Sequence, residues 1–271
     1  KALARRYNGT YPDPHQSGTY LPKVKYLQAW NEPNLMSFLN PQAEEGLISS
    51  PDIYRELLNR FYGAVKSVAP DVKVLAAGLA PLGGPIDMAT APLRFLRKLT
   101  CLQATLRPKP RCPDFIRADI LDIHPYTTGG PTHKALENKD NIALGDLLEL
   151  NATTKAADRY RKIRGSKERT RLWATEFAWD TAPDPGGLPM WLAKRWTAEA
   201  LFRMWDAGIS VMTWLLIVDA PPPNSELLWG GFGQSGFYYH ALNPVNAKRK
   251  GSLQAFRFPF VAFKTARGYR V

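Results

Sequence analysis

The chain has 271 residues, of which 45% are hydrophobic and 11% aromatic, a composition that supports a sizeable core and excludes an intrinsically disordered chain. Lys and Arg (36) exceed Asp and Glu (24) by 12, so the surface can attract polyanions or acidic sugars. The basic residues are scattered and include the run Lys248-Arg249-Lys250; without a nucleic-acid-binding signature, we predict solvated faces and no nucleic-acid partner.

Apolar, strand-like runs alternate with amphipathic, helix-like segments along the whole chain. Strands are predicted over residues 24–30, 72–79, 118–126, 171–179 and 209–218. Helices are predicted over 51–70, 91–104, within 142–164, over 189–207 and over 252–267, the last interrupted by Pro259. This alternation predicts an α/β fold, with a parallel sheet covered by helices in a single domain over residues 1–271. The loops after the strands are long and carry Trp, Tyr, His and Glu, so functional groups are expected at the carboxyl ends of the strands.

Two glutamates follow predicted strands, where an unpaired buried charge would be costly. Glu32 stands in "AWNEPN" after the strand at 24–30, and Glu176 ends "RLWATEF". One such residue alone could pair with an arginine or cap a helix. Two of them on different strands, each beside a tryptophan, are typical of glycoside hydrolysis, in which one protonated and one ionised carboxyl group flank the scissile bond.

Four motifs resemble strand ends of the clan A glycoside hydrolases, with the nearest likeness to family 39 β-glycosidases. "AWNEPN" is similar to the end of strand four of that barrel and "DIHPY" to the end of strand six. "WATEFAW" resembles strand seven, and "VMTWLLIVD" resembles strand eight. The resemblance implies an incomplete TIM barrel of five parallel β/α units, corresponding to strands four to eight, with the first three units absent.

The resemblance also implies roles for individual residues. Glu32 would be the general acid/base and Glu176 the nucleophile. Asn31 would hydrogen-bond the sugar 2-hydroxyl, Tyr126 would hold Glu176 ionised and oriented, and Trp214 would stack on the sugar. Three further residues complete the predicted substrate-binding set, each with a structural role as an equal alternative: Trp30, His124 and Trp179. No cofactor and no metal site is predicted.

Cys101 and Cys112 are the only cysteines in the sequence. A disulfide formed in an oxidising compartment is favoured over two free thiols, and no histidine stands close enough in the sequence to suggest a zinc site. No run of 18 apolar residues occurs, so no membrane span is predicted. The chain opens on Lys1 and shows no signal peptide, which suggests a processed chain; a secreted or periplasmic location is favoured over a cytoplasmic one.

The function predicted from these features is that of a retaining β-glycosidase of the β-glucosidase, β-xylosidase or β-galactosidase type. Two alternatives stay open: a non-catalytic, carbohydrate-binding remnant of a barrel, and an anion- or nucleic-acid-binding domain suggested by the net charge alone. Five parallel strands cannot close a barrel, so the strands at 24–30 and 209–216 should present open edges. Segments 8–22 and 226–240, or the second subunit of a homodimer, are expected to cover those edges.

Overall fold

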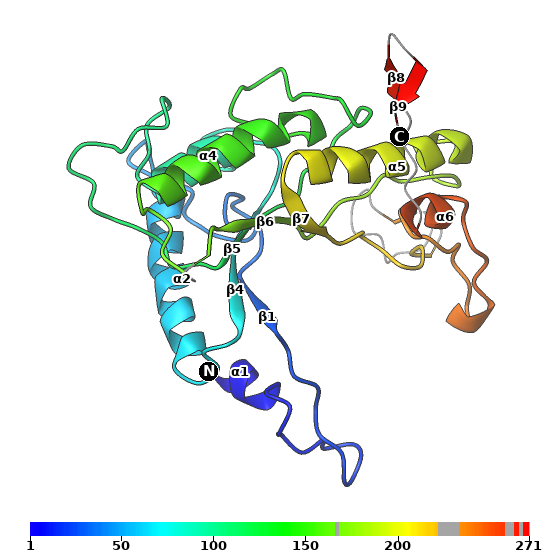
Figure 1. Cartoon of the computed structure of the whole chain (residues 1–271), viewed down its shortest axis with the longest axis horizontal. Coiled ribbons are helices and arrows are strands. Elements are labelled where there is room, and N and C mark those ends of the chain that lie inside the picture. The colour runs from blue at the N-terminus through cyan, green and yellow to red at the C-terminus, as the bar shows by residue number, and fades with distance from the viewer. Residues whose placement is uncertain (166–167, 222–232, 258–262, 266–267, 271) are drawn as a thin grey trace. The chain divides into compact units, whose positions relative to one another are not determined.

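A computed structural model describes residues 1–165, 168–221, 233–257, 263–265 and 268–270 (Figure 1). The central feature is one sheet of five parallel strands in the order β1-β4-β5-β6-β7. The strands of this sheet are β1 (Tyr26–Ala29), β4 (Lys73–Leu79), β5 (Ile120–Ile123), β6 (Arg171–Ala174) and β7 (Ile209–Met212). The predicted α/β fold with five parallel β/α units is confirmed.

Helices follow the strands as the sequence pattern predicts. They are α1 (Ala2–Arg6), α2 (Ser50–Lys66), α3 (Pro92–Leu99), α4 (Leu147–Arg159), α5 (Met190–Asp206) and α6 (Ser252–Arg257), with 3₁₀ turns η1 (Leu144–Asp146) and η2 (Pro244–Asn246). Pro51 and Pro92 stand in the first turns of α2 and α3, where a helix leaves the backbone N–H groups unbonded. None of the described helices combines the length and apolar character needed to cross a membrane.

The chain divides into two compact units. Unit 1 consists of Lys1–Ile123, Glu137–Asn141 and Glu149–Trp173, and unit 2 of His124–Leu136, Ile142–Leu148 and Ala174–Val271. The organisation of the whole chain as a single domain stays a prediction.

The core of unit 1 lies between its strands and helices α2 and α3. All residues of β4 after Lys73 and all four residues of β5 are buried, which explains why both strands are almost entirely apolar in sequence. Helix α2 runs along β1 and β4 (Figure 1) and buries Leu58 and Val65. Each fully buried side chain of this size stabilises the fold by about 1.5–3 kcal/mol.

Some predicted boundaries were wrong. Three predicted strands stop early, at Ile123, Ala174 and Met212. After the first of them, Pro125 has no backbone N–H to donate to a ladder. The last helix ends at Arg257 rather than 267, and residues 263–265 instead form strand β8 (Phe263–Thr265), paired antiparallel with β9 (Gly268–Arg270). Pro259, which lies outside the described residues, lacks the backbone N–H that a helix interior needs.

A short hairpin was missed by the sequence reasoning. Strands β2 (Ala43–Glu44) and β3 (Leu47–Ile48) pair antiparallel around Glu45 and Gly46, whose φ angles are 48° and 75°. Two successive residues with positive φ are the geometry of a tight hairpin turn. The signal in the sequence is the glycine after a polar residue, flanked by pairs too short to show alternation.

The predicted covering of the sheet edges stays a prediction. Segment 8–22 forms a bridge of its own between Pro12 and Tyr20, and α1 packs near Leu27 of β1. Of the segment 226–240, residues 226–232 lie outside the described residues. The homodimer stays a prediction.

Candidate active site

In unit 1, the predicted residues Trp30, Asn31 and Glu32 directly follow β1. The backbone is held in the left-handed region at Trp30 (φ 77°) and Glu32 (φ 41°). The N–H of Glu32 donates to the carbonyl of Gly78 at 3.0 Å, which fixes this turn against the end of β4. Such conformations cost about 1–3 kcal/mol each in non-glycine residues and concentrate at functional sites.

The Asn-Glu-Pro-Asn turn is anchored by its last residue. Asn34 is fully buried; its amide nitrogen donates to the carbonyls of Ala80 (3.1 Å) and Thr90 (3.0 Å), and its amide oxygen accepts from the N–H of Ala80 (2.9 Å). The turn therefore owes its rigidity to Asn34. Trp30 is 52% exposed and donates its indole N–H to the carbonyl of Phe38 at 2.8 Å, so it does not lie in the core.

Tyr54 of α2 is a positioning residue that the sequence reasoning missed. Its hydroxyl donates to the carbonyl of Ala29 at 2.6 Å and accepts from the N–H of Ala77 at 2.7 Å. It is fully buried, and this burial raises the pKa of Tyr54 well above its usual range. Ala77 (φ 87°) lies where the pairing of β4 with β5 shifts register, so one hydroxyl bridges the last residue of β1 to a bulge in β4. The only sequence signal is helical spacing, which places Tyr54 on the same buried face as Leu58 and Val65.

In unit 2, the structure brings three predicted residues together. The hydroxyl of Tyr126 donates to Oε2 of Glu176 at 3.1 Å, and Nδ1 of His124 lies 3.5 Å from the same oxygen. His124 directly follows β5 and is fully buried, whereas the side chain of Glu176 is 32% exposed. Nε2 of His124 lies 3.1 Å from Oγ1 of Thr175, a contact that sequence reasoning missed. Glu176 is thus oriented by two groups and still open to solvent.

Aromatic rings pack around Phe177, the residue that follows Glu176. Phe177 stacks on Tyr126 (ring centroids 6.4 Å apart) and meets Trp179 (4.7 Å) and Trp214 (5.9 Å) edge-on. Trp179 is 7% exposed and donates its indole N–H to the carbonyl of Thr127 at 3.1 Å. Trp179 therefore packs in the core of unit 2, the alternative that the sequence left open.

Trp214 is held by the segment after residue 232. Its indole N–H donates to the carbonyl of Ser235 at 2.7 Å, and its ring stacks on Phe237 with centroids 4.9 Å apart. The Ser235 hydroxyl in turn donates to the carbonyl of Leu215 at 2.6 Å. The orientation of Trp214 therefore depends on how residues 235–237 are fixed.

A buried ion pair fixes that segment. Nζ of Lys250 donates to Oδ1 of Asp219 (2.7 Å), Oγ1 of Thr181 (2.8 Å) and the carbonyl of Gln234 (2.8 Å). Asp219 also accepts from the N–H of Gly236 at 2.9 Å. Both charged side chains are fully buried; burial is the largest effect on each, lowering the pKa of Lys250 and raising the pKa of Asp219. The prediction that this basic run is a solvated face was wrong for Lys250.

A further carboxyl group of unit 2 has an altered acidity. Burial raises the pKa of Asp180 to about 6, although the N–H of Gln234 donates to its Oδ1 at 2.9 Å, which lowers the pKa. Asp180 directly follows Trp179, and the same residue Gln234 links it to Lys250. The protonation of Asp180 is therefore coupled to the segment that holds Trp214.

The sequence matches no protein-family model and no curated protein. Two similar solved structures are a family 39 glycoside hydrolase of Xanthomonas axonopodis pv. citri (20% identity, TM-score 0.50) and one of Bacteroides cellulosilyticus WH2 (18% identity, TM-score 0.51). The likeness covers 86% and 84% of this chain, respectively. The fold resembles part of a family 39 barrel. The chain spans 39% of the length of each of these structures, and the fold predicted from the strand-end motifs is confirmed.

Proposed function

We propose that the protein is a retaining glycoside hydrolase that cleaves β-glycosidic bonds, with Glu176 as the nucleophile and Glu32 as the general acid/base. The observation that carries the proposal is the surroundings of Glu176, a partly exposed carboxylate that receives the Tyr126 hydroxyl and lies beside His124. The family 39 fold supports it, because both glutamates follow the carboxyl ends of strands in one parallel sheet, where α/β barrels build their active sites.

The proposed reaction is a double displacement. The Glu176 carboxylate attacks the anomeric carbon while Glu32 protonates the departing oxygen, so the glycosidic C–O bond breaks and a glycosyl ester forms. Glu32, now ionised, removes a proton from water, which attacks the anomeric carbon and releases the sugar and Glu176. Retention of the β configuration requires the two carboxyl groups to act about 5–5.5 Å apart. Asn31 would hydrogen-bond the sugar 2-hydroxyl, and Trp214 would stack on the sugar ring.

The test compares Glu176→Gln and Glu32→Gln on a panel of aryl β-glycosides with good and poor leaving groups. Glu176→Gln should abolish turnover of every substrate, because no other group can form the glycosyl ester. Glu32→Gln should lose activity mainly with poor leaving groups, since activated phenolates need no protonation. Azide, which needs no base to attack, should restore turnover to Glu32→Gln and give a β-glycosyl azide.

Glu137→Gln, a neutralisation of an exposed glutamate in unit 1, is the matched control and should behave as wild type. NMR of the first-formed sugar should show the β anomer. An α anomer would contradict retention. Oligosaccharide binding by a chain that turns over none of the substrates would favour the non-catalytic, carbohydrate-binding alternative.

A further inference from the structure

One stretch of unit 1 is strongly basic. Residues 88–113 contain no Asp or Glu, and their six basic residues are Arg94, Arg97, Lys98, Arg107, Lys109 and Arg111. Nearby acidic side chains neutralise two of these charges, since Arg97 pairs with Asp140 at 2.7 Å and Lys98 pairs with Asp52 at 2.9 Å. Three others are gathered in the loop that Cys101 and Cys112 enclose.

Arg107, Lys109 and Arg111 are exposed and have no acidic partner within the residues that the structure describes. Their positively charged side chains are exposed to solvent, and they occupy every second position of the loop, i, i+2 and i+4. These three residues are called the basic loop below. Maintaining three like charges so close together costs free energy unless an anionic partner binds them.

The basic loop is rigid. A disulfide joins Cys101 to Cys112, whose Cα atoms are 5.8 Å apart, as the sequence favoured. Within the loop, the N–H of Lys109 donates to the carbonyl of Cys101 at 2.7 Å, and the N–H of Gln103 donates to the carbonyl of Arg107 at 2.8 Å. A partner that binds these cations therefore orders only their side chains and not the backbone, which favours binding.

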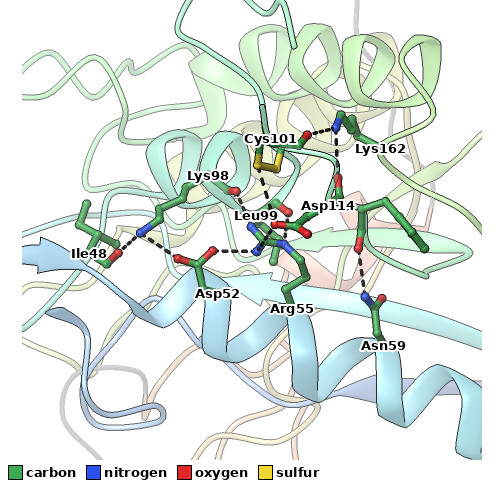
Figure 2. Close-up of polar contacts among 11 residues, drawn as sticks. Ile48, Asp52, Arg55, Asn59, Lys98, Leu99, Cys101, Asp114 and Lys162 are labelled. Atoms are coloured by element: carbon green, nitrogen blue, oxygen red, sulfur yellow. Dashed lines mark hydrogen bonds and ion pairs between the residues drawn. A yellow bond between two sulfur atoms is a disulfide. The ribbon is translucent and has the colours of Figure 1, made fainter. Parts of the chain in front are cut away.

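The base of the loop is also fixed, as Figure 2 shows. Nζ of Lys162 donates to the carbonyls of Cys112 (2.6 Å) and Asp114 (3.2 Å). The guanidinium of Arg55 donates to the carbonyls of Lys98 (2.7 Å) and Leu99 (2.9 Å) and lies 3.5 Å from Asp114. The carboxylate of Asp114 pairs with Arg55, and its side chain is 52% exposed.

Two more guanidinium groups lie near Phe115, which follows the disulfide in the chain. The chain after Cys112 runs beside residues 162–164, where the N–H of Arg164 donates to the carbonyl of Ile116 at 2.8 Å. Arg164 stacks on the ring of Phe115 at 3.6 Å, and Arg117 lies 6.0 Å from the same ring. Both arginines are exposed. One face of the half-buried Phe115 ring is thus covered by the Arg164 guanidinium.

This surface lies away from Glu32. The basic loop and residues 114–117 precede the amino end of β5, whereas Glu32 follows the carboxyl end of β1 in the same parallel sheet. The amino ends of barrel strands are ordinarily the stabilising face. Among the residues that the structure describes, the side chains of the basic loop form no ion pair that would hold the unit together.

We propose that the basic loop, with Arg117 and Arg164, binds a polysaccharide whose sugars carry carboxylate groups. Guanidinium groups match carboxylates in shape and charge. The disulfide is typical of proteins in oxidising compartments such as the extracellular space. Binding of single-stranded nucleic acid relies on open aromatic faces, and Arg164 covers one face of Phe115. The choice of a carbohydrate as the partner rests on the proposed glycosidase function, whereas the binding of a polyanion by these cations does not.

The test measures binding of fluorescently labelled polygalacturonate, a uronate polymer, at several salt concentrations. The variant Arg107→Gln/Lys109→Gln/Arg111→Gln should bind at least about tenfold more weakly, the loss expected for three exposed ionic contacts, and its affinity should depend less on salt. The double variant Arg107→Gln/Lys109→Gln keeps Arg111, whose φ is 57°, and should lose an intermediate part of the binding affinity. If the triple variant does not fold, this double variant still tests the proposal.

The matched control is Lys1→Gln/Arg5→Gln/Arg6→Gln, which removes the same charge from α1 and its N-cap residue in the same unit. It should retain wild-type affinity within about twofold; an equal loss would show attraction by net charge alone and overturn the proposal. Tighter binding of single-stranded nucleic acid to the same surface would overturn it in favour of that partner. Glu176→Gln should bind polygalacturonate as wild type does. Binding of polygalacturonate and turnover of aryl glycosides are thus measured separately, so a failure of the proposed glycosidase function is distinguished from a failure of this proposal.

Discussion

Replacing Lys250 with methionine would break the ion pair that fixes the support of Trp214. The substitution keeps most of the side-chain volume but removes three hydrogen bonds and leaves Asp219 without its counter-ion in a fully buried place. Burial shifts the pKa of both partners toward their neutral forms. Without Lys250, the ionised form of Asp219 is therefore unfavourable in this place. Removing one partner of such a pair costs about 3–5 kcal/mol, a large part of an ordinary protein's stability.

Urea unfolding followed by far-ultraviolet circular dichroism measures this cost. Lys250→Met should lower the unfolding free energy by about 3–5 kcal/mol with little change in the urea dependence. The double variant Lys250→Met/Asp219→Asn should recover about 2 kcal/mol or more, because the neutral amide still accepts the N–H of Gly236 and no charge is stranded.

Two results would refute the reasoning. A loss below about 1 kcal/mol for Lys250→Met would mean that water or a rearrangement reaches Asp219, so that the pair is not buried as described. A double variant no more stable than the single one would mean that the lost packing of the lysine, and not the stranded carboxylate, sets the cost.

Four further predictions concern other parts of the chain. Replacing Cys101 and Cys112 together with serine should lower the unfolding free energy by about 3 kcal/mol, because the disulfide closes a loop of 11 residues in the unfolded chain; urea unfolding measures it. Tyr54→Phe should cost about 1–3 kcal/mol in the same assay, since two buried backbone groups lose their partner. Tyr126→Phe should lower kcat/KM on aryl glycosides about tenfold or more with little change in stability, and an unchanged value would remove this residue from the proposed mechanism. The folded-state pKa of Asp180, about 6, is above its usual 3.8, so the native state binds this proton more tightly than the unfolded chain does. The unfolding free energy should therefore fall by about 1–2 kcal/mol as the pH rises from 4 to 6. Asp180→Asn should flatten that part of the pH–stability curve.

The sequence by itself determined the order of the strands and helices. Period-two and period-3.6 patterns are local, so the five strands and the helices after them could be located, although the ends differ by 218 − 212 = 6 residues for the last strand of the sheet and by 267 − 257 = 10 for the last helix. Glu32 and Glu176 stand out for the same reason, because a carboxylate at the end of an apolar run is visible without knowing what it contacts. The disulfide followed from there being only two cysteines.

Only the tertiary structure decided which polar groups are buried and what they hold. Tyr54 contacts residues 25 and 23 positions away, His124 contacts Thr175 across 51 positions, and Lys250 contacts Asp219 across 31 positions. In the sequence Lys250 belongs to a basic run typical of a surface, and Tyr54 is one residue of an amphipathic helix. Their roles depend on partners that chain folding brings together, and the free energy of a buried polar group depends on those partners and not on its neighbours in the sequence.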